Sequence, residues 1–115
     1  MPKALPVIDM SAPVCCRPVA AGPVDDRSAL EVALRLKALA DPVRVRLISL
    51  LLSEASTTGA LAGVVALSEP TVSHHLGQLR TAGLIDSERQ GMNVVHSPRR
   101  DALAALCSVL DPNCC

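Results

Sequence analysis

The chain has 115 residues and no Phe, Trp or Tyr, and its 11 basic side chains balance 11 acidic ones. This length fits one domain with a modest aliphatic core, which small proteins often stabilise by forming a dimer. The zero net charge argues against a uniformly basic coat for nucleic acid, and no apolar run predicts a signal peptide or membrane span, so we expect a cytoplasmic protein with mostly reduced cysteines and no membrane partner.

The charges are distributed unevenly along the chain. All three histidines fall between residues 74 and 96, and Asp86 and Glu88 are the only carboxylates between residues 71 and 100. The same segment holds Arg80 and Arg89. This pattern favours a second half that faces a polyanion.

Five of the nine prolines lie in residues 1–24, which predicts an extended N-terminal arm. Asp25-Asp26 supplies an N-cap for a helix that runs to about Leu39. Asp41-Pro42 is a second helix start, with Asp as the cap and Pro in the first turn. We therefore divide the chain into an arm (1–24), a domain (25–110) and a cysteine-bearing tail (111–115).

The second half predicts two short helices and a hairpin. One helix spans roughly Thr58–Ala66 and the next Glu69–Ala82, and Gly83 is placed to end the second. The β-prone runs Leu84–Arg89 and Asn93–Ser97 form a hairpin, and a last helix covers Arg99–Leu110. The expected fold is mainly α with a small β-hairpin wing: a winged helix-turn-helix.

The helix at Glu69–Ala82 has an apolar side and a polar side, and its polar side suits the major groove of DNA. Thr71 and Ser73 are short enough for a close approach, while His74 and Gln78 can hydrogen-bond to base edges. The predicted DNA-binding residues are Ser68, Pro70, Thr71, Ser73, His74, Gln78, Arg80 and Arg89. The competing interpretation is an ordinary amphipathic helix. We expect His75 to pack internally, and Arg99 and Arg100 to be solvated charges.

The stretch Lys37–Arg44 reads KALADPVR, which resembles the segment that opens the core of the ArsR/SmtB metalloregulators. Residues 67–76 (LSEPTVSHHL) are similar to that family's recognition helix, and residues 79–85 resemble its continuation. The likeness covers about residues 28–110. It implies a homodimer formed by the first and last helices, which binds a palindromic operator and represses a resistance or homeostasis operon until an inducer arrives.

Two inducer sites that are common in the family are absent here. One uses a Cys-x-Cys pair, but the matching positions lie near Thr57 and Gly59. The other uses Asp and His on the last helix, and residues 99–110 contain no His.

The sulfur donors are Cys15, Cys16, Cys107, Cys114 and Cys115. Vicinal thiols such as Cys15-Cys16 can chelate a soft ion, and this pair resembles the one on the arm of some actinobacterial arsenic-responsive members. Arsenite, antimonite, cadmium or lead would need a third or fourth donor, from Cys107 or the tail. Cys107 could instead be a small hydrophobe, and the tail cysteines could be incidental.

The sequence leaves two other functions open. The same scaffold could sense oxidation, through a bond between Cys107 and an arm or tail cysteine. An enzyme such as an arsenate reductase or thiol transferase needs a nucleophilic Cys in an anion loop or a Cys-x-x-Cys motif, and neither occurs. We therefore expect a non-enzymatic repressor with no organic cofactor.

Overall fold

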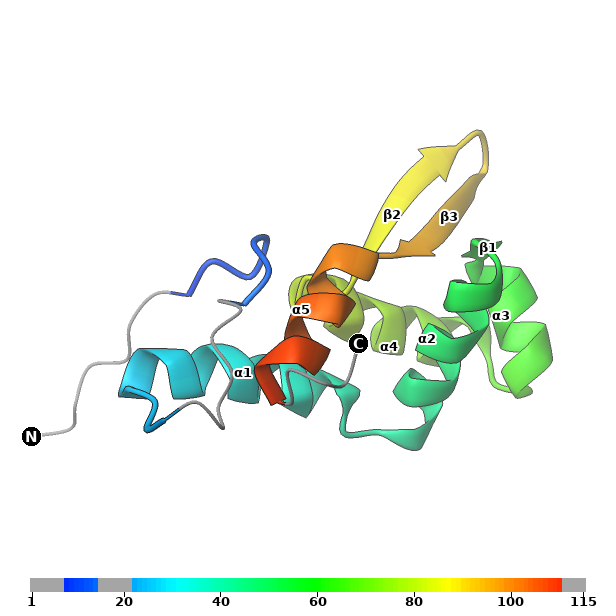
Figure 1. Cartoon of the computed structure of the whole chain (residues 1–115). Helices are drawn as coiled ribbons and strands as arrows, with labels where there is room; N and C mark the ends of the chain where they lie inside the picture. Colours follow the sequence, from blue (N-terminus) through cyan, green and yellow to red (C-terminus); the bar gives the residue numbers. More distant parts are fainter. Residues whose placement is uncertain (1–7, 15–21, 111–115) are drawn as a thin grey trace, which may run out of the picture.

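The computed structural model describes residues 8–14 and 22–110, which form five helices and a small sheet at one side of them. Figure 1 shows the hairpin of β2 and β3 projecting from the helical body. In chain order the elements are α1 Asp26–Leu39, α2 Pro42–Ser53, β1 Ser56–Thr57, α3 Thr58–Val65, α4 Glu69–Thr81, β2 Ile85–Gln90, β3 Asn93–Pro98 and α5 Arg100–Leu110. The predicted winged helix-turn-helix is confirmed.

Side-chain caps start the helices where the sequence predicts them. The Asp25 carboxylate accepts from the Ser28 amide at 2.7 Å, and that of Asp41 accepts from the Val43 amide at 2.8 Å. These bonds satisfy amides that the first turn of a helix leaves without a partner. The predicted starts of α1 and α2 are therefore correct.

The turn between α3 and α4 is short because Ala66 adopts a left-handed conformation, with φ of 57°. Ser68 then caps α4, and its hydroxyl accepts from the Thr71 amide at 3.4 Å. The other end of α4 is followed by Gly83, whose φ of +74° favours glycine. The cap and the glycine together fix the length of α4.

The wing contains a strand that the sequence did not reveal. Ser56 and Thr57 pair antiparallel with β3, opposite His96 and Val95. The strand order is β1-β3-β2. β1 is only two residues long, so it carries no alternating pattern that would predict it. It ties the base of the hairpin to the start of α3.

The interior is aliphatic, as the composition requires. Its fully buried side chains include Leu47, Leu51, Leu76, Leu79 and Leu84, contributed by α2, α4 and the start of the wing. This core is what holds α4 in place. None of the helices in the described ranges is both long and apolar enough to cross a membrane.

Of the two arginines where α5 begins, Arg100 is exposed, as expected, whereas Arg99 is partly buried, so the expectation of a solvated charge is wrong for Arg99. Arg100 donates to the Leu52 carbonyl oxygen at 2.8 Å, across 48 residues of sequence. Arg99 donates to the Ser11 carbonyl and pairs with Asp101 at 3.1 Å. These contacts join α5 to α2 and to residues 8–14.

Candidate nucleic-acid interface

The two sides of α4 differ as the sequence predicts. Val72, Leu76 and Leu79 are buried in the core. The side chains at the predicted DNA-binding positions on α4 are all exposed: Pro70, Thr71, Ser73, His74, Gln78 and Arg80. Ser68, in front of the helix, is also exposed. The structure thus brings seven of the eight predicted residues together on or beside one helix.

Two of these residues are already engaged with each other. The Ser68 and Thr71 hydroxyl oxygens lie 2.8 Å apart, within hydrogen-bond distance. Since Ser68 also caps the helix, its first task is structural. The Thr71 hydroxyl is held at the N-terminal end of α4, where partial positive charge favours anions such as phosphate.

The flank of α4 that faces α2 is held by a histidine. His75 is half-buried, and its Nδ1 accepts from Arg44 Nε at 3.1 Å, so the prediction that it packs internally is confirmed. Its neighbour His74 stays exposed, with the two rings 6.0 Å apart in an edge-on arrangement. His74 is therefore the histidine of this pair that can reach a ligand.

An open groove of about 620 Å³ runs along the same flank. His74 and Gln78 line it from α4, and Lys37 and Arg44 line it from α1 and α2. No local pattern in the sequence predicts that these two basic residues line the interface. They belong to segments far from α4 in sequence, and only the tertiary fold shows that they share its rim.

The flank of α4 that faces the wing carries a chain of polar contacts. Arg80 donates to the Ser87 hydroxyl at 3.4 Å, and that oxygen lies 2.7 Å from His96 Nδ1. His96 Nε2 lies 2.8 Å from the Thr58 hydroxyl at the start of α3. His96 is only 3% exposed, and its pKa is lowered by burial and, secondarily, by the charge of Arg80. A neutral His96 thus joins the wing to α3 and α4.

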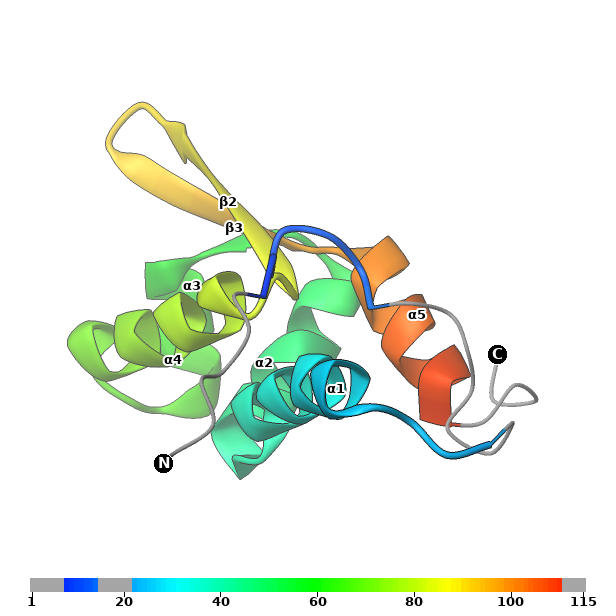
Figure 2. The same ribbon diagram turned by 90° about the vertical axis from the view of Figure 1, so that its left-hand side faces the viewer.

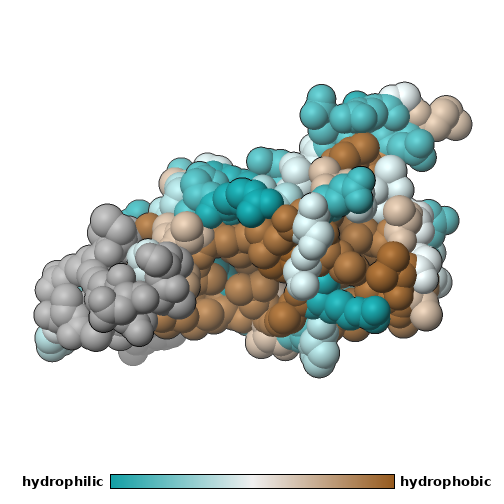
Figure 3. Space-filling model, turned by 45° about the vertical axis from the view of Figure 1, so that its right-hand side comes forward, coloured by the Kyte–Doolittle hydropathy of each residue, from teal (hydrophilic) through white to brown (hydrophobic). Residues whose placement is uncertain are grey.

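The wing ends in an exposed, mainly polar tip. Arg89 is exposed, and its Nε donates to the Gly91 carbonyl at 3.4 Å. Met92 at the turn is 95% exposed. Figure 3 shows the wing projecting as a largely hydrophilic arm above an apolar body. The eighth predicted residue, Arg89, therefore lies on a separate prong from α4, where it can contact DNA beside the groove.

The predicted thiol site falls mostly outside the described residues. This is so for Cys15, Cys16, Cys114 and Cys115. Cys107 is half-buried on α5 and is disulfide-bonded. Among the described residues, no three His, Cys, Asp or Glu side chains are grouped so that they could hold a metal ion. The described part of the chain therefore does not by itself form a metal site.

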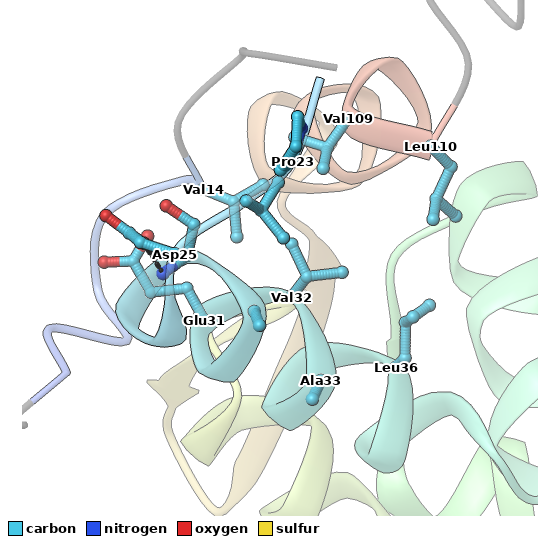
Figure 4. Close-up of a pocket in the computed structure, with 12 residues that line it drawn as sticks. Val14, Pro23, Asp25, Glu31, Val32, Ala33, Leu36, Val109 and Leu110 are labelled. Atoms are coloured by element: carbon cyan, nitrogen blue, oxygen red, sulfur yellow. Dashed lines mark hydrogen bonds between the residues drawn. The ribbon is translucent and has the colours of Figure 1, made fainter. Parts of the chain in front are cut away.

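A cavity of about 590 Å³ opens between α1 and α5 (Figure 4). Its walls are mainly apolar and include Val32 and Leu36 of α1 and Val109 and Leu110 of α5, while Asp25 and Glu31 lie at its edge. Leu36 is 37% and Leu110 48% exposed. One chain alone leaves these two helices incompletely covered.

A polar-faced helix braced by a short preceding helix and followed by a β-hairpin defines a winged helix-turn-helix protein. A model of the family described as bacterial regulatory protein, arsR family, matches residues 41–87. The Biofilm growth-associated repressor of Agrobacterium fabrum is 34% identical over 88 residues, which cover 76% of this chain and 75% of that protein. The chain belongs to the ArsR family of transcriptional regulators.

Solved structures agree with this assignment. The homodimeric winged helix-turn-helix DNA-binding domain Mb0332 from Mycobacterium bovis matches with a TM-score of 0.64 and 27% identity, over 74% of this chain and 82% of that one. A possible transcriptional regulator for arsenical resistance matches with a TM-score of 0.60 and 33% identity, over 63% of this chain and 75% of that one. These relatives are regulators rather than enzymes.

Proposed function

We propose that this protein is a homodimeric repressor that places α4 in the major groove of a palindromic operator. The observation that carries the proposal is the exposed polar side of α4, which is anchored by a buried leucine-rich side and braced on both flanks. A rigid helix with short polar side chains at its N-terminal end can approach base edges closely.

The side chains divide into two groups by what they can recognise. Gln78 has the donor and acceptor pair that reads adenine, and His74 beside it can donate or accept. Arg80 and Arg89 carry charge at the wing side and suit phosphates, as do Lys37 and Arg44 on the other rim of the groove. The first group would set sequence preference and the second would set affinity.

The incompletely covered helices α1 and α5 support a second copy of the chain as the two-fold partner. The apolar cavity and the exposed leucines of α1 and α5 offer a surface that a second copy could cover. Two α4 helices related by a two-fold axis would read half-sites about one helical turn of DNA apart, on the order of 34 Å.

To test this function, the full-length protein is used to select DNA duplexes from a randomised library. Its affinity for each selected duplex is then measured by fluorescence anisotropy. Gln78→Ala should lower affinity for the selected duplex and lose preference at one base position, by about 1–3 kcal/mol. The matched control is Gln90→Ala at the end of β2, which should leave base preference unchanged. If the wild-type protein selects no sequence, the proposed function is wrong.

We also propose that soft metal or metalloid ions relieve repression through the cysteine thiolates. Support comes from the sequence, in which Cys15-Cys16 resembles the vicinal pair of actinobacterial arsenic-responsive members, and from the similarity to a possible regulator for arsenical resistance. Thiolates select soft acceptors such as trivalent arsenic or antimony, cadmium and lead. Cys107, Cys114 and Cys115 are the candidates for completing the ligand set.

This second proposal is tested on anaerobic, fully reduced protein bound to the selected duplex. Arsenite, antimonite, cadmium or lead should reduce affinity by about 5–150-fold, the usual range of coupling between two sites. Replacing both Cys15 and Cys16 with Ser should leave binding intact and abolish release. Release that survives in this double variant contradicts the proposed site.

The disulfide at Cys107 favours a second candidate, in which the same repressor senses oxidation. Formation of a disulfide removes two electrons and two protons from a pair of thiols, and a peroxide can accept them and be reduced to water. Cys107→Ser should then abolish peroxide-driven release of the duplex. Non-reducing mass spectrometry of the released protein identifies the bonded cysteines.

A further inference from the structure

Residues 8–14, here called the N-terminal strap, fold back onto the domain. Figure 2 shows this segment, in blue, passing from the end of α4 across the base of β2 to α5. Met10 packs against the hydrophobic core, and Val14 is 5% exposed. The strap is therefore bound to the domain by buried side chains rather than lying in solvent.

A buried arginine holds the middle of the strap. Arg35 of α1 is only 2% exposed, and its Nη2 donates to the Ala12 carbonyl at 2.7 Å and to the Asp9 carbonyl at 3.3 Å. Its Nη1 donates to the Glu31 carbonyl within α1 at 2.8 Å. A buried guanidinium is costly unless its donors are satisfied, so an undocked strap would leave this cation short of partners.

A glycine admits the strap to the end of α4. A Cβ atom at Gly83 would lie 1.9 Å from the Met10 carbonyl oxygen, which is an impossible contact. Gly83 is thus required twice, once by its φ of +74° and once by the approach of the strap. Arg99 also donates to the Ser11 carbonyl. The strap is fixed to α1, to the α4–β2 junction and to the segment before α5.

The place where the strap binds is the joint between the two DNA-facing parts. Met10 and Ser11 share a small cavity with Arg80 and Thr81 of α4 and Ile85 of β2. Any movement of the strap therefore changes the packing between α4 and the wing.

We propose that the N-terminal strap is a docked segment that holds α4 and the wing in their operator-binding arrangement. This inference rests on the proposed function and names the element that sets the arrangement of its two DNA-facing parts. A strap that favours the DNA-bound arrangement must, by linkage, be bound more tightly when operator is present.

The first experiment uses two glycines with similar backbone conformations. Gly83→Ala introduces left-handed strain and the contact with Met10, whereas Gly91→Ala introduces the strain alone, because nothing lies within 4 Å of its Cβ and its φ is +63°. Amide hydrogen exchange should be at least about ten-fold faster over residues 8–14 in Gly83→Ala. It should be unchanged there in Gly91→Ala.

The second experiment removes the donors of the buried arginine. Arg35→Met keeps the apolar stem and loses the bonds to the strap, and Arg27→Met, at an exposed position on the same helix, is the control. Both Arg35→Met and Gly83→Ala should weaken binding to the selected duplex by about 5–150-fold, with circular dichroism reporting whether each variant is folded. A folded variant with a freely exchanging strap and wild-type affinity overturns the proposal.

The linkage is measured on wild-type protein with and without the selected duplex. Amide exchange over residues 8–14 should slow when the duplex is bound. Exchange that stays constant contradicts the coupling, although the repressor function stands. If the wild-type protein binds no duplex, the proposed function fails, and exchange in the free protein still shows whether the strap is docked.

Discussion

The DNA-facing half of the molecule and the half formed by α1 and α5 complete their interiors in different ways. In the first, fully buried leucines are joined by buried polar contacts through His96, so α3, α4 and the wing support one another within one chain. In the second, an apolar cavity and two exposed leucines remain between the helices. One chain is therefore sufficient to build α3, α4 and the wing, but it does not cover α1 and α5.

The most severe way to break the DNA-facing half is to remove a leucine from its core. Leu79 is fully buried beneath α4, so Leu79→Ala should lower the free energy of unfolding by about 2–5 kcal/mol through lost burial and a residual cavity. Urea unfolding measures this. Leu67→Ala, at a position 38% exposed, is the control and should cost much less. Equal costs would show that α4 is not anchored by this core.

A charge placed between α1 and α5 tests whether the other half needs a second copy. Leu36→Glu should weaken the dimer by at least about ten-fold, because burying a leucine contributes about 1.5–3 kcal/mol and a buried carboxylate opposes association. Sedimentation equilibrium gives the dissociation constant. Val64→Glu on α3, at a position 53% exposed, should leave the dimer intact. A Leu36→Glu protein that remains fully dimeric would place the interface elsewhere.

Replacing His96 with Gln tests the polar contacts that unite wing and helices. The loss of one of the two hydrogen bonds of the buried His96 ring should lower the free energy of unfolding by about 1–3 kcal/mol. The pKa of His96 is lowered by burial, so the unfolded chain binds this proton at a higher pH than the folded chain does. Stability should therefore fall as the pH drops below about 6.5, and it should fall less in His96→Gln.

The pH series needs a histidine control, which the exposed His74 provides. His74→Gln should keep the pH dependence of the wild-type protein, as measured by thermal unfolding between pH 5 and pH 8. A His96→Gln protein whose stability changes with pH as steeply as the wild type would show that another group is responsible.

The smallest expected effect comes from Arg89 on the wing, which we expect to contact phosphate, whereas α4 should contact bases. Arg89→Ala should weaken binding to all duplexes alike and reduce the slope of log affinity against log salt by about 1, as expected for one lost phosphate contact. Anisotropy titrations at several salt concentrations give the slope. Glu88→Gln, its exposed neighbour, should not reduce it. A change in base preference would instead place Arg89 in a groove.

Local signals predicted most of this fold. Asp25, Asp41 and Ser68 mark helix starts, and Gly83 marks the end of α4, because each acts within a few residues of its own position. The polar side of α4 follows from helical periodicity alone. These features need no knowledge of the tertiary structure.

The contacts that escaped prediction join distant parts of the sequence. Arg44 meets His75 across 31 residues, and Thr58 meets His96 across 38. The hydrogen bonds from Arg35 to the strap also join distant parts of the sequence. Their acceptors are backbone carbonyls, which every residue has, so the residue types in the strap do not predict them. The predicted thiol site depends on four cysteines outside the described residues, and it stays a prediction.

A core built without aromatic residues has a practical consequence for spectroscopy. A protein without Trp or Tyr absorbs very little in the near ultraviolet. In most proteins the strong absorption of Trp and Tyr masks weaker bands in this range. Absorption from sulfur bonded to cadmium, lead or arsenic would stand on a nearly empty background, and so would the weak band of a disulfide. The choice between metal sensing and oxidation sensing can therefore be followed optically in the unlabelled chain.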